Sequence, residues 1–414
     1  MRATAPFGRP TGEAADMASE QDPVGVLYLD VEGGWGGSSR SMYYLIEPLD
    51  RKSWRPLVLS RKPGPNDERY RHIGVSHLTI PEMPVFRPGE RKNAVAFALF
   101  VLSLWQLPRL LRKLRTLVQR YGVRLIHANH ESIAPFALFV ARQFGLPCVC
   151  HIRTQLKDSV FARLLDRIIN RFADHLIFIA EPNERHFAAL VGPTFDKDKS
   201  SIIFNATPKF PGAPPPAEFL DPPGAFRVIS LSNFSPDRGV DLLIDVAQEL
   251  RQRGRDDFVF YLCGRLAHKR LMPGARNRYL DEMVARVGRL GLDRYVRFMG
   301  HVSEPQRALA AGHALIRLRR NLSPWGRDII EAMMAGLPIV TLGSFHGFVE
   351  PGVNGYIAAR FSPTEIADYL IELAQNPDKR QRIAAANREK AARLFDPEAC
   401  ASRVTEIYRS VLQR

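Results

Sequence analysis

The sequence of 414 residues is poor in cysteine and contains no long apolar run. Its cysteines are too few, and their surroundings too apolar, for a disulfide framework or a zinc site, so we expect a reducing compartment. No stretch reaches the roughly 20 apolar residues that a membrane-spanning helix needs. Residues 1–22 lack the apolar segment of a signal peptide, and their Pro, Gly and Ala content predicts a disordered tail.

Acidic residues are outnumbered: 43 Asp and Glu stand against 58 Lys and Arg, which gives a formal net charge of +15 and a pI near 9.9. Such a charge favours anionic partners, namely nucleotides, nucleic acid or an acidic membrane surface. The sequence has no basic stripe with interleaved aromatic residues of the kind that binds single strands, so we expect no nucleic-acid partner. The chain length predicts two domains.

Short apolar runs alternate with helical patterns along most of the chain. The runs expected to be buried strands are 24–29, 124–128, 147–152, 175–180, 227–232, 258–264, 296–300, 314–318 and 337–342. This alternation predicts an α/β fold of parallel sheets that are covered on both faces. It stops where seven prolines occur between Pro208 and Pro223, which no sheet interior would tolerate, and then restarts.

The predicted domains follow from this interruption. We expect an N-terminal Rossmann-like domain over 23–206, a Pro-rich linker over 207–224 and a C-terminal domain over 225–396. The last segment reads as one helical, basic pattern over 378–413, and its end, 397–414, is expected to pack back on the N-terminal domain. Two doubly wound domains predict a ligand cleft at the carboxyl ends of their sheets.

A glycine-rich loop, DVEGGWGGSSRS, follows the first expected strand. Glycines such as Gly36 and Gly37 allow a phosphate to approach the backbone at a helix N-terminus, although a simple tight turn explains them equally well. The spacing is not that of a dinucleotide-binding fingerprint, so a nicotinamide site is poorly supported.

A second loop, SNFSPDRGVDLLIDVA, opens the first helix of the C-terminal domain, expected over 240–252. Arg238 and Gly239 lie at its N-terminus, where a cation opposes the helix dipole unless an anion lies between them. We therefore favour a ligand-binding role for Arg238 over that of an ordinary exposed charge.

A third stretch, WGRDIIEAMMAGLPIV, places one acid in an apolar helix. Glu331 lies about one turn after the turn at Trp325 and Gly326, and its helical neighbours look buried. It is either a solvated residue on a narrow polar stripe or a carboxylate that accepts hydrogen bonds from ribose hydroxyls. Four nearby arginines could bind a diphosphate, although one or two could be plain surface charges: Arg317, Arg319, Arg320 and Arg327.

The segment 93–120 is apolar in its first half and basic in its second. No Asp or Glu occurs between Arg91 and His130. Pro108 separates the two halves, so they need not form one straight helix. The segment is either an interior helix with a basic solvent face or an interfacial contact with an anionic membrane.

Together these stretches resemble the retaining glycosyltransferases of family 4, which have the GT-B architecture of two Rossmann-like domains facing each other across a cleft. The resemblance covers the chain from residue 24 on. Its most specific parts are GRDIIEAMMAGLPIV followed by GFVEPGVNGYI, with SPDRGVDLLIDVA and IIFNA in support.

The resemblance implies roles for individual residues. Glu331 matches the second Glu of the family's E-x7-E motif, which binds the nucleotide ribose, and Arg238 matches the Lys that neutralises the departing diphosphate. His151 matches a histidine that faces the reaction centre; from the residues alone, it would be a hydrogen-bonded residue at a strand end. The implied donor-binding set also includes Gly36, Gly37, Asn233, Gly264, Ser323, Trp325, Gly326 and Arg327, with Arg319 and Arg320 as further diphosphate ligands.

Two positions depart from the family pattern. Ser323 stands where the first Glu of E-x7-E is expected, which affects how the hydroxyls of the donor sugar are held. Asn233 stands where an Arg is usual, which removes one cation from the diphosphate site.

The implied function is transfer of a sugar, with retention, from a nucleotide-diphosphate sugar of UDP or GDP type to a hydroxyl of a lipid-linked or cell-envelope glycan. We expect no cofactor and no metal, since no Asp-x-Asp pair is suited to hold a divalent ion on a diphosphate. The expected location is cytoplasmic and peripheral on the inner membrane face. The alternatives are a non-catalytic protein that binds a glycan or nucleotide, and a sugar-nucleotide epimerase.

Overall fold

The computed structural model describes residues 22–86, 93–209, 214–265 and 278–414, and it divides into two compact units. Unit 1 comprises Met1–Phe204 and Pro397–Arg414, and unit 2 comprises Asn205–Asp396. The predicted tail, apart from Asp22, and residues 210–213 of the predicted linker lie outside the described residues. The rest of that linker belongs to unit 2, which begins two residues before the predicted linker does.

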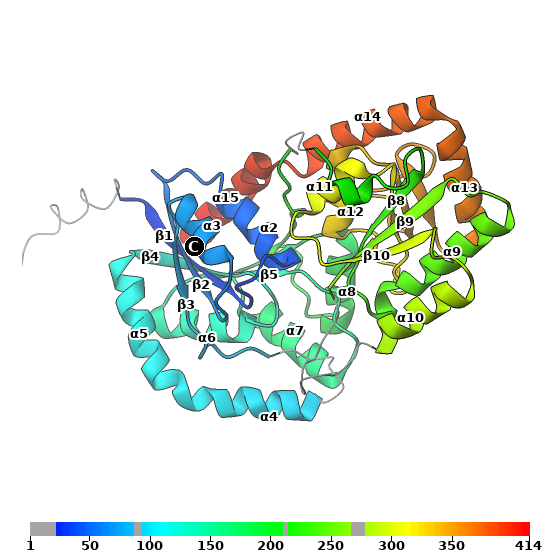
Figure 1. Cartoon of the computed structure of the whole chain (residues 1–414). Helices are drawn as coiled ribbons and strands as arrows, with labels where there is room; N and C mark the ends of the chain where they lie inside the picture. Colours follow the sequence, from blue (N-terminus) through cyan, green and yellow to red (C-terminus); the bar gives the residue numbers. More distant parts are fainter. Residues whose placement is uncertain (1–21, 87–92, 210–213, 266–277) are drawn as a thin grey trace, which may run out of the picture. The chain divides into compact units, whose positions relative to one another are not determined.

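The described part of unit 1 holds a seven-stranded parallel sheet of order β3-β2-β1-β4-β5-β6-β7 (Figure 1). Its strands are β1 (Val24–Asp30), β2 (Trp54–Ser60), β3 (Ser76–Thr79), β4 (Val123–Ala128), β5 (Cys148–Ile152), β6 (His175–Phe178) and β7 (Ser200–Ile202). The chain order reverses between β1 and β4. In open α/β sheets, ligands bind at the carboxyl ends of the strands at such a switch point.

Helices cover both faces of this sheet. They are α2 (Gly37–Ile46), α3 (Asn66–His72), α4 (Asn93–Ser103), α5 (Leu107–Arg120), α6 (Ala134–Phe144), α7 (Val160–Phe172), α8 (Glu181–Val191) and α15 (Pro397–Leu412). The predicted helical segment 378–413 is divided between α14 (Pro377–Leu394) of unit 2 and α15 of unit 1.

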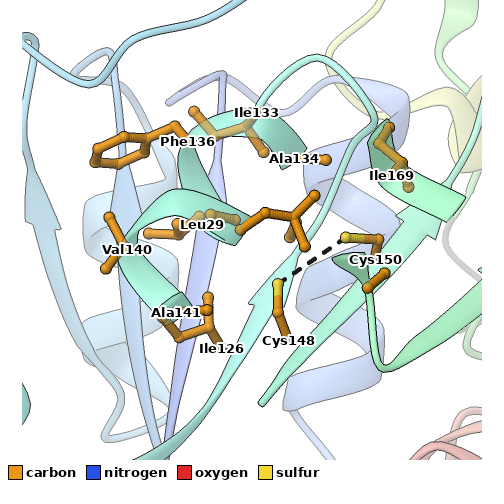
Figure 2. Close-up of a cluster of buried hydrophobic side chains, with 14 of the residues drawn as sticks. Leu29, Ile126, Ile133, Ala134, Phe136, Val140, Ala141, Cys148, Cys150 and Ile169 are labelled. Carbon is orange, nitrogen blue, oxygen red and sulfur yellow. Dashed lines mark hydrogen bonds between the residues drawn. The ribbon is translucent and has the colours of Figure 1, made fainter. Parts of the chain in front are cut away.

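One face of the sheet is apolar in its centre. Leu29 of β1, Ile126 of β4 and the two cysteines of β5 pack against α6 and against Ile169 of α7 (Figure 2). The Cys148 and Cys150 Sγ atoms lie 4.0 Å apart and belong to buried, free cysteines. Both point to this face because successive side chains of a strand alternate in direction.

The opposite face carries buried polar and aromatic side chains. His127 of β4 shares a hydrogen bond of 2.6 Å between its Nδ1 and the Tyr408 hydroxyl of α15, and Tyr408 in turn donates to the Tyr28 hydroxyl of β1 at 3.2 Å. The ring of Tyr408 also contacts Trp54 edge-on, with centroids 5.5 Å apart. These contacts fix the last helix of the chain on unit 1.

The segment 93–120 is bent, because a 3-10 turn (Leu104–Gln106) separates α4 from α5 (Figure 1). Helix α5 buries Leu110 and Leu114 in the core and exposes the basic residues Arg109, Arg112, Lys113 and Arg115. Among the described side chains of the segment, four large apolar ones are exposed, with exposed fractions of 41% for Phe97, 47% for Val101, 65% for Leu102 and 67% for Trp105. The Leu99 side chain lies outside the described set. No helix in the described ranges is long and apolar enough to span a bilayer.

The described part of unit 2 repeats the doubly wound plan with a six-stranded parallel sheet of order β10-β9-β8-β11-β12-β13. The strands are β8 (Phe226–Leu231), β9 (Phe258–Cys263), β10 (Val296–Gly300), β11 (Ala314–Arg317), β12 (Ile339–Leu342) and β13 (Gly355–Ala358). Besides α14, the helices are α9 (Val240–Gln252), α10 (Arg278–Arg289), α11 (Pro305–Ala311), α12 (Arg327–Ala335) and α13 (Pro363–Gln375). The switch point lies between β8 and β11. The predicted α/β class with two doubly wound domains is confirmed.

Tyr408→Phe should destabilise unit 1, because it leaves the buried His127 Nδ1 without its hydroxyl partner. We expect the free energy of unfolding, measured by urea denaturation, to fall by about 1–3 kcal/mol. Tyr356→Phe is the matched control, since its hydroxyl bonds to Glu365 at an exposed site. Equal effects of the two substitutions would mean that the buried bond does not stabilise unit 1.

Candidate active site

The loops that follow β8 and β11 meet at the switch point of unit 2. Gly239, between the short 3-10 turn Pro236–Arg238 and α9, has a φ of +65°, and a Cβ atom there would lie 1.8 Å from the Leu318 carbonyl oxygen. Only glycine fits this position, both for its backbone conformation and for the close approach. The contact brings Arg238 next to the stretch that follows β11.

Three guanidinium groups gather at this point. The ion pairs are Arg317 Nε to Asp328 Oδ2 at 2.8 Å, Arg319 Nη2 to Asp237 Oδ2 at 3.4 Å and Arg238 Nε to Asp237 Oδ2 at 3.7 Å. Two guanidinium groups thus share one carboxylate, which leaves an excess of positive charge. Burial, and then the charges of Arg238 and Arg317, lower the pKa of Arg319 to about 10. An anion would relieve this repulsion.

The other two arginines predicted to bind a diphosphate are bound to acids. Arg320 donates two hydrogen bonds to Asp241, of 2.9 and 2.6 Å, at the start of α9. Arg327 forms an ion pair with Glu331 and donates from Nη1 to the Ala206 carbonyl oxygen at 2.9 Å. The structure therefore places Arg317 and Arg319, of the four, with Arg238.

Glu331 is 1% exposed and does not lie on a solvated polar stripe. Its Oε1 accepts a hydrogen bond of 2.8 Å from Nε of Arg327, one turn earlier in α12. The helical neighbours Ile329, Ile330 and Met333 are buried, as the sequence predicts, and Gly336 ends the helix with a φ of +80°. The acid is thus a buried, charge-compensated carboxylate.

The loop before α12 folds over Arg317. The buried Ser323 accepts a hydrogen bond from Arg317 Nη1 at its carbonyl oxygen, and its hydroxyl donates to Asn321 Oδ1 at 2.7 Å. A Cβ atom at Gly326, the N-cap of α12, would lie 2.6 Å from Arg317 Nη2. Trp325 contacts the Phe345 ring edge-on at 5.9 Å between centroids.

Asn233 and Gly264 lie at the carboxyl ends of β8 and β9. The exposed Asn233 accepts a hydrogen bond of 3.1 Å from the Arg265 backbone N–H, and the Gly264 N–H donates to the Gly300 carbonyl oxygen at 2.7 Å. The predicted donor-binding residues of unit 2 thus all follow strands of one sheet at the same edge. Their role in binding remains a prediction.

The glycine-rich loop of unit 1 connects β1 to α2 at the switch point of that sheet. Gly36 is the N-cap of α2 and Gly37 is its first residue. Both are exposed, and a Cβ atom at either position would meet nothing within 4 Å. The first backbone N–H groups of α2 are therefore not covered by close packing, as an anion-binding helix end requires.

Beside this loop, a buried polar network joins the carboxyl ends of β1, β4 and β5. Asn129 donates from Nδ2 to Asp30 Oδ1 at 3.1 Å and accepts at Oδ1 from Arg153 Nη2 at 2.7 Å. Arg153 Nη2 also lies 3.3 Å from His151 Nδ1. Burial, and then the charge of Arg153, lower the pKa of His151, so that the ring is neutral near pH 7.

Of this network, only His151 was expected from the sequence. Asp30, Asn129 and Arg153 each follow an apolar strand run directly, and adjacent strands of a parallel sheet end at the same edge. Polar residues at that position are the signal that could have found them.

Two family models match the chain over most of its length. A glycosyl transferase 4-like domain matches residues 36–199, and the model of glycosyl transferases group 1 matches residues 217–390. The chain belongs to the group 1 glycosyltransferases. Its α/β fold of two doubly wound units is the GT-B fold, and the chain is a glycosyltransferase enzyme.

Curated glycosyltransferases share limited identity with this enzyme. Phosphatidyl-myo-inositol mannosyltransferase of Mycobacterium leprae is 31% identical over 135 residues, which span 32% of this chain and 36% of that protein. Alpha-D-kanosaminyltransferase of Streptomyces kanamyceticus is 25% identical over 387 residues, 86% of this chain and 95% of the relative.

Solved structures share the fold. Alr3699/HepE of Anabaena in complex with UDP and glucose aligns with a TM-score of 0.75 at 22% identity, over 93% of this chain and 99% of that one. Sucrose-phosphate synthase of Thermosynechococcus elongatus aligns with a TM-score of 0.73 at 19% identity, over 94% and 99% of the two chains.

Glu331→Gln should lower the stability of unit 2, because it leaves the buried guanidinium of Arg327 without its carboxylate. We expect a loss of about 3 kcal/mol in urea denaturation. The double substitution Arg327→Met with Glu331→Gln should recover most of this loss, since it removes both charges. Strictly additive effects in this double-mutant cycle would contradict a stabilising pair.

Proposed function

We propose that the enzyme transfers a sugar from a nucleotide-diphosphate sugar to a hydroxyl acceptor with retention of the anomeric configuration. The observation that carries the proposal is the gathering of Arg238, Arg317 and Arg319 around too few carboxylates at the switch point of unit 2. The diphosphate of the donor supplies the missing negative charge. A donor of UDP or GDP type fits this site, and the UDP complex of the Anabaena protein supports the first.

The chemistry follows from this charge. The bond between the sugar and the diphosphate breaks as the acceptor hydroxyl attacks from the same face, and negative charge develops on the leaving diphosphate. The proton of the hydroxyl passes to an oxygen of that diphosphate. Arg238 and Arg319 stabilise that charge from fixed positions, which lowers the barrier without a reorganisation of solvent. In this mechanism the chain's own cations serve the leaving group, and no cofactor takes part.

Glu331 binds the ribose hydroxyls in this proposal. A carboxylate accepts several hydrogen bonds at once, so the ribose can bond to Glu331 while Arg327 keeps its pair with Oε1. Arg327 then holds the carboxylate in one orientation before the donor arrives. Burial of both side chains strengthens these bonds relative to bonds in water.

The acceptor is a lipid-linked or cell-envelope glycan, reached at the cytoplasmic face of an anionic membrane. The printed name of the Mycobacterium leprae relative, a phosphatidyl-myo-inositol mannosyltransferase, supports a lipid acceptor. The exposed apolar residues of 93–120, among them Leu102 and Trp105, precede the exposed cations of α5. An apolar wedge followed by cations is typical of proteins that dock on anionic leaflets.

Helix α7 extends this surface. The Phe161 ring lies 5.7 Å from the Phe97 ring of α4, and the neighbouring Val160 and Leu164, one turn apart, are exposed. The exposed Arg163 beside them donates two hydrogen bonds to Asp158, of 2.7 and 2.6 Å, so this part of the surface is apolar with a balanced ion pair. The docking surface therefore comprises α4, α5 and the first turns of α7.

Arg238→Ala should weaken nucleoside diphosphates about 30-fold or more and leave the parent nucleosides almost unchanged, because the partner of Arg238 is the phosphate. Calorimetric titration with UDP, GDP, uridine and guanosine measures this. Arg320→Ala, which removes a guanidinium already bound to Asp241, is the control and should change affinity less than about threefold. An unchanged ratio of diphosphate to nucleoside affinity in Arg238→Ala would contradict the assignment.

Co-sedimentation with liposomes should rise with anionic lipid content and fall with salt. Replacing four of the exposed cations of α5 by Gln, namely Arg109, Arg112, Lys113 and Arg115, should lower binding more than about tenfold, since each contributes about 1 kcal/mol near an anionic surface. The matched control replaces four exposed arginines of unit 2 by Gln: Arg289, Arg294, Arg382 and Arg393. Equal losses of liposome binding in the two variants would mean that binding depends on the net charge of the protein and not on α5. Binding that does not change with lipid charge would contradict the docking surface.

A further inference from the structure

The hydrogen-bond chain at the carboxyl edge of the unit 1 sheet constrains the ring of His151. A guanidinium group carries only donors, so the 3.3 Å contact from Arg153 Nη2 requires a lone pair on His151 Nδ1. In a neutral imidazole the proton then resides on Nε2. A charged ring would carry a proton on Nδ1 as well and would face the guanidinium with like charge.

Arg153 is held firmly enough to impose this constraint. Its Nε donates to the Asn129 carbonyl oxygen at 2.7 Å and to Asn129 Oδ1 at 3.0 Å, and its Nη2 donates to the same Oδ1. Asn129 cannot turn its amide around, because its Nδ2 donates to Asp30. The backbone N–H of Arg153 donates to Glu131 Oε2 at 3.1 Å. The Arg153 side chain is thus held at its guanidinium group by Asn129 and at its backbone by Glu131.

The other ring nitrogen of His151, Nε2, is buried. His151 is 3% exposed, and its Nε2 has no hydrogen-bond partner among the described residues. A buried N–H without an acceptor is costly, so such a group is rare in a folded protein unless a ligand or water meets it. The register of β4 and β5 pairs Ala128 with Cys150, so Asn129 and His151 follow at the carboxyl edge of the sheet, where ligands of open α/β sheets bind.

We infer that Arg153 is a positioning residue, which locks His151 in the Nε2–H tautomer so that Nε2 donates a hydrogen bond to an oxygen of the bound substrate. The substrate half of this inference rests on the proposed function. The tautomer half concerns the protein without any ligand, so the two can fail separately.

The tautomer is read directly by two-bond ¹⁵N–¹H correlation spectra of protein labelled with ¹⁵N-histidine, with His151 assigned by loss of its signals in His151→Gln. The parent should show an unprotonated Nδ1 and a protonated Nε2 at neutral pH. Arg153→Met, similar in length, should release the ring into a mixture of tautomers. Arg185→Met, which removes an exposed arginine of α8, should leave the spectrum unchanged.

The steady-state rates test the substrate half. With a nucleotide sugar as donor, Arg153→Met should lower kcat by about 10- to 100-fold and change KM less than about threefold, because an oriented donor is lost in the transition state. Arg153→Lys, which restores a donor toward Nδ1, should recover part of kcat.

These measurements distinguish the claim about the tautomer of His151 from the claim about its contact with the substrate. A proton on Nδ1 of His151 in the parent, or an unchanged tautomer in Arg153→Met, would overturn the lock, and the parent spectrum alone decides this if the Met variant does not fold. A raised KM at unchanged kcat would overturn the substrate contact. If the parent transfers no sugar from any nucleotide donor while the tautomer is as expected, the proposed function is wrong, but Arg153 still fixes the tautomer of His151.

Discussion

Unit 2 is organised by one electrostatic constraint, the confinement of Arg238, Arg317 and Arg319 at the switch point of a parallel sheet. Burial, and then the charges of Arg238 and Arg317, lower the pKa of Arg319, as expected for cations that repel one another. The loops tolerate this repulsion because backbone packing fixes them: Gly239 lies against Leu318, and Gly326 lies against Arg317. The fold therefore maintains a positive site before any ligand arrives, which is the condition for electrostatic catalysis.

The sheet of unit 1 has the same doubly wound plan, but the polar groups at its switch point are paired with one another. At its switch point, polar side chains are paired within the protein: Asp30 with Asn129, Asn129 with Arg153, and Glu131 with the Arg153 backbone. Such a network has no charge to spare for an anion, and its effect is to orient side chains. The switch point of unit 2 thus carries an excess of positive charge, whereas that of unit 1 carries paired and oriented polar groups.

The sequence predicted the elements better than the contacts. Helix α9 begins and ends where its pattern predicted, at Val240 and Gln252, because local periodicity decides such bounds. The pair of Arg327 with Glu331 was not predicted, since charges four residues apart on a helix are usually solvated. Arg153, the partner of His151, lies only two residues away, but the residues that hold it were missed: Asn129 and Asp30 reach it only through the strand order β1-β4-β5. Local pattern carries no information about that order.

A structure of the enzyme with UDP or GDP bound tests the central claim most directly. We expect diphosphate oxygens within hydrogen-bonding distance of Arg238 and Arg319, and ribose hydroxyls on Glu331, which keeps its pair with Arg327. A diphosphate bound away from these guanidinium groups, or a ribose that does not contact Glu331, would contradict that claim.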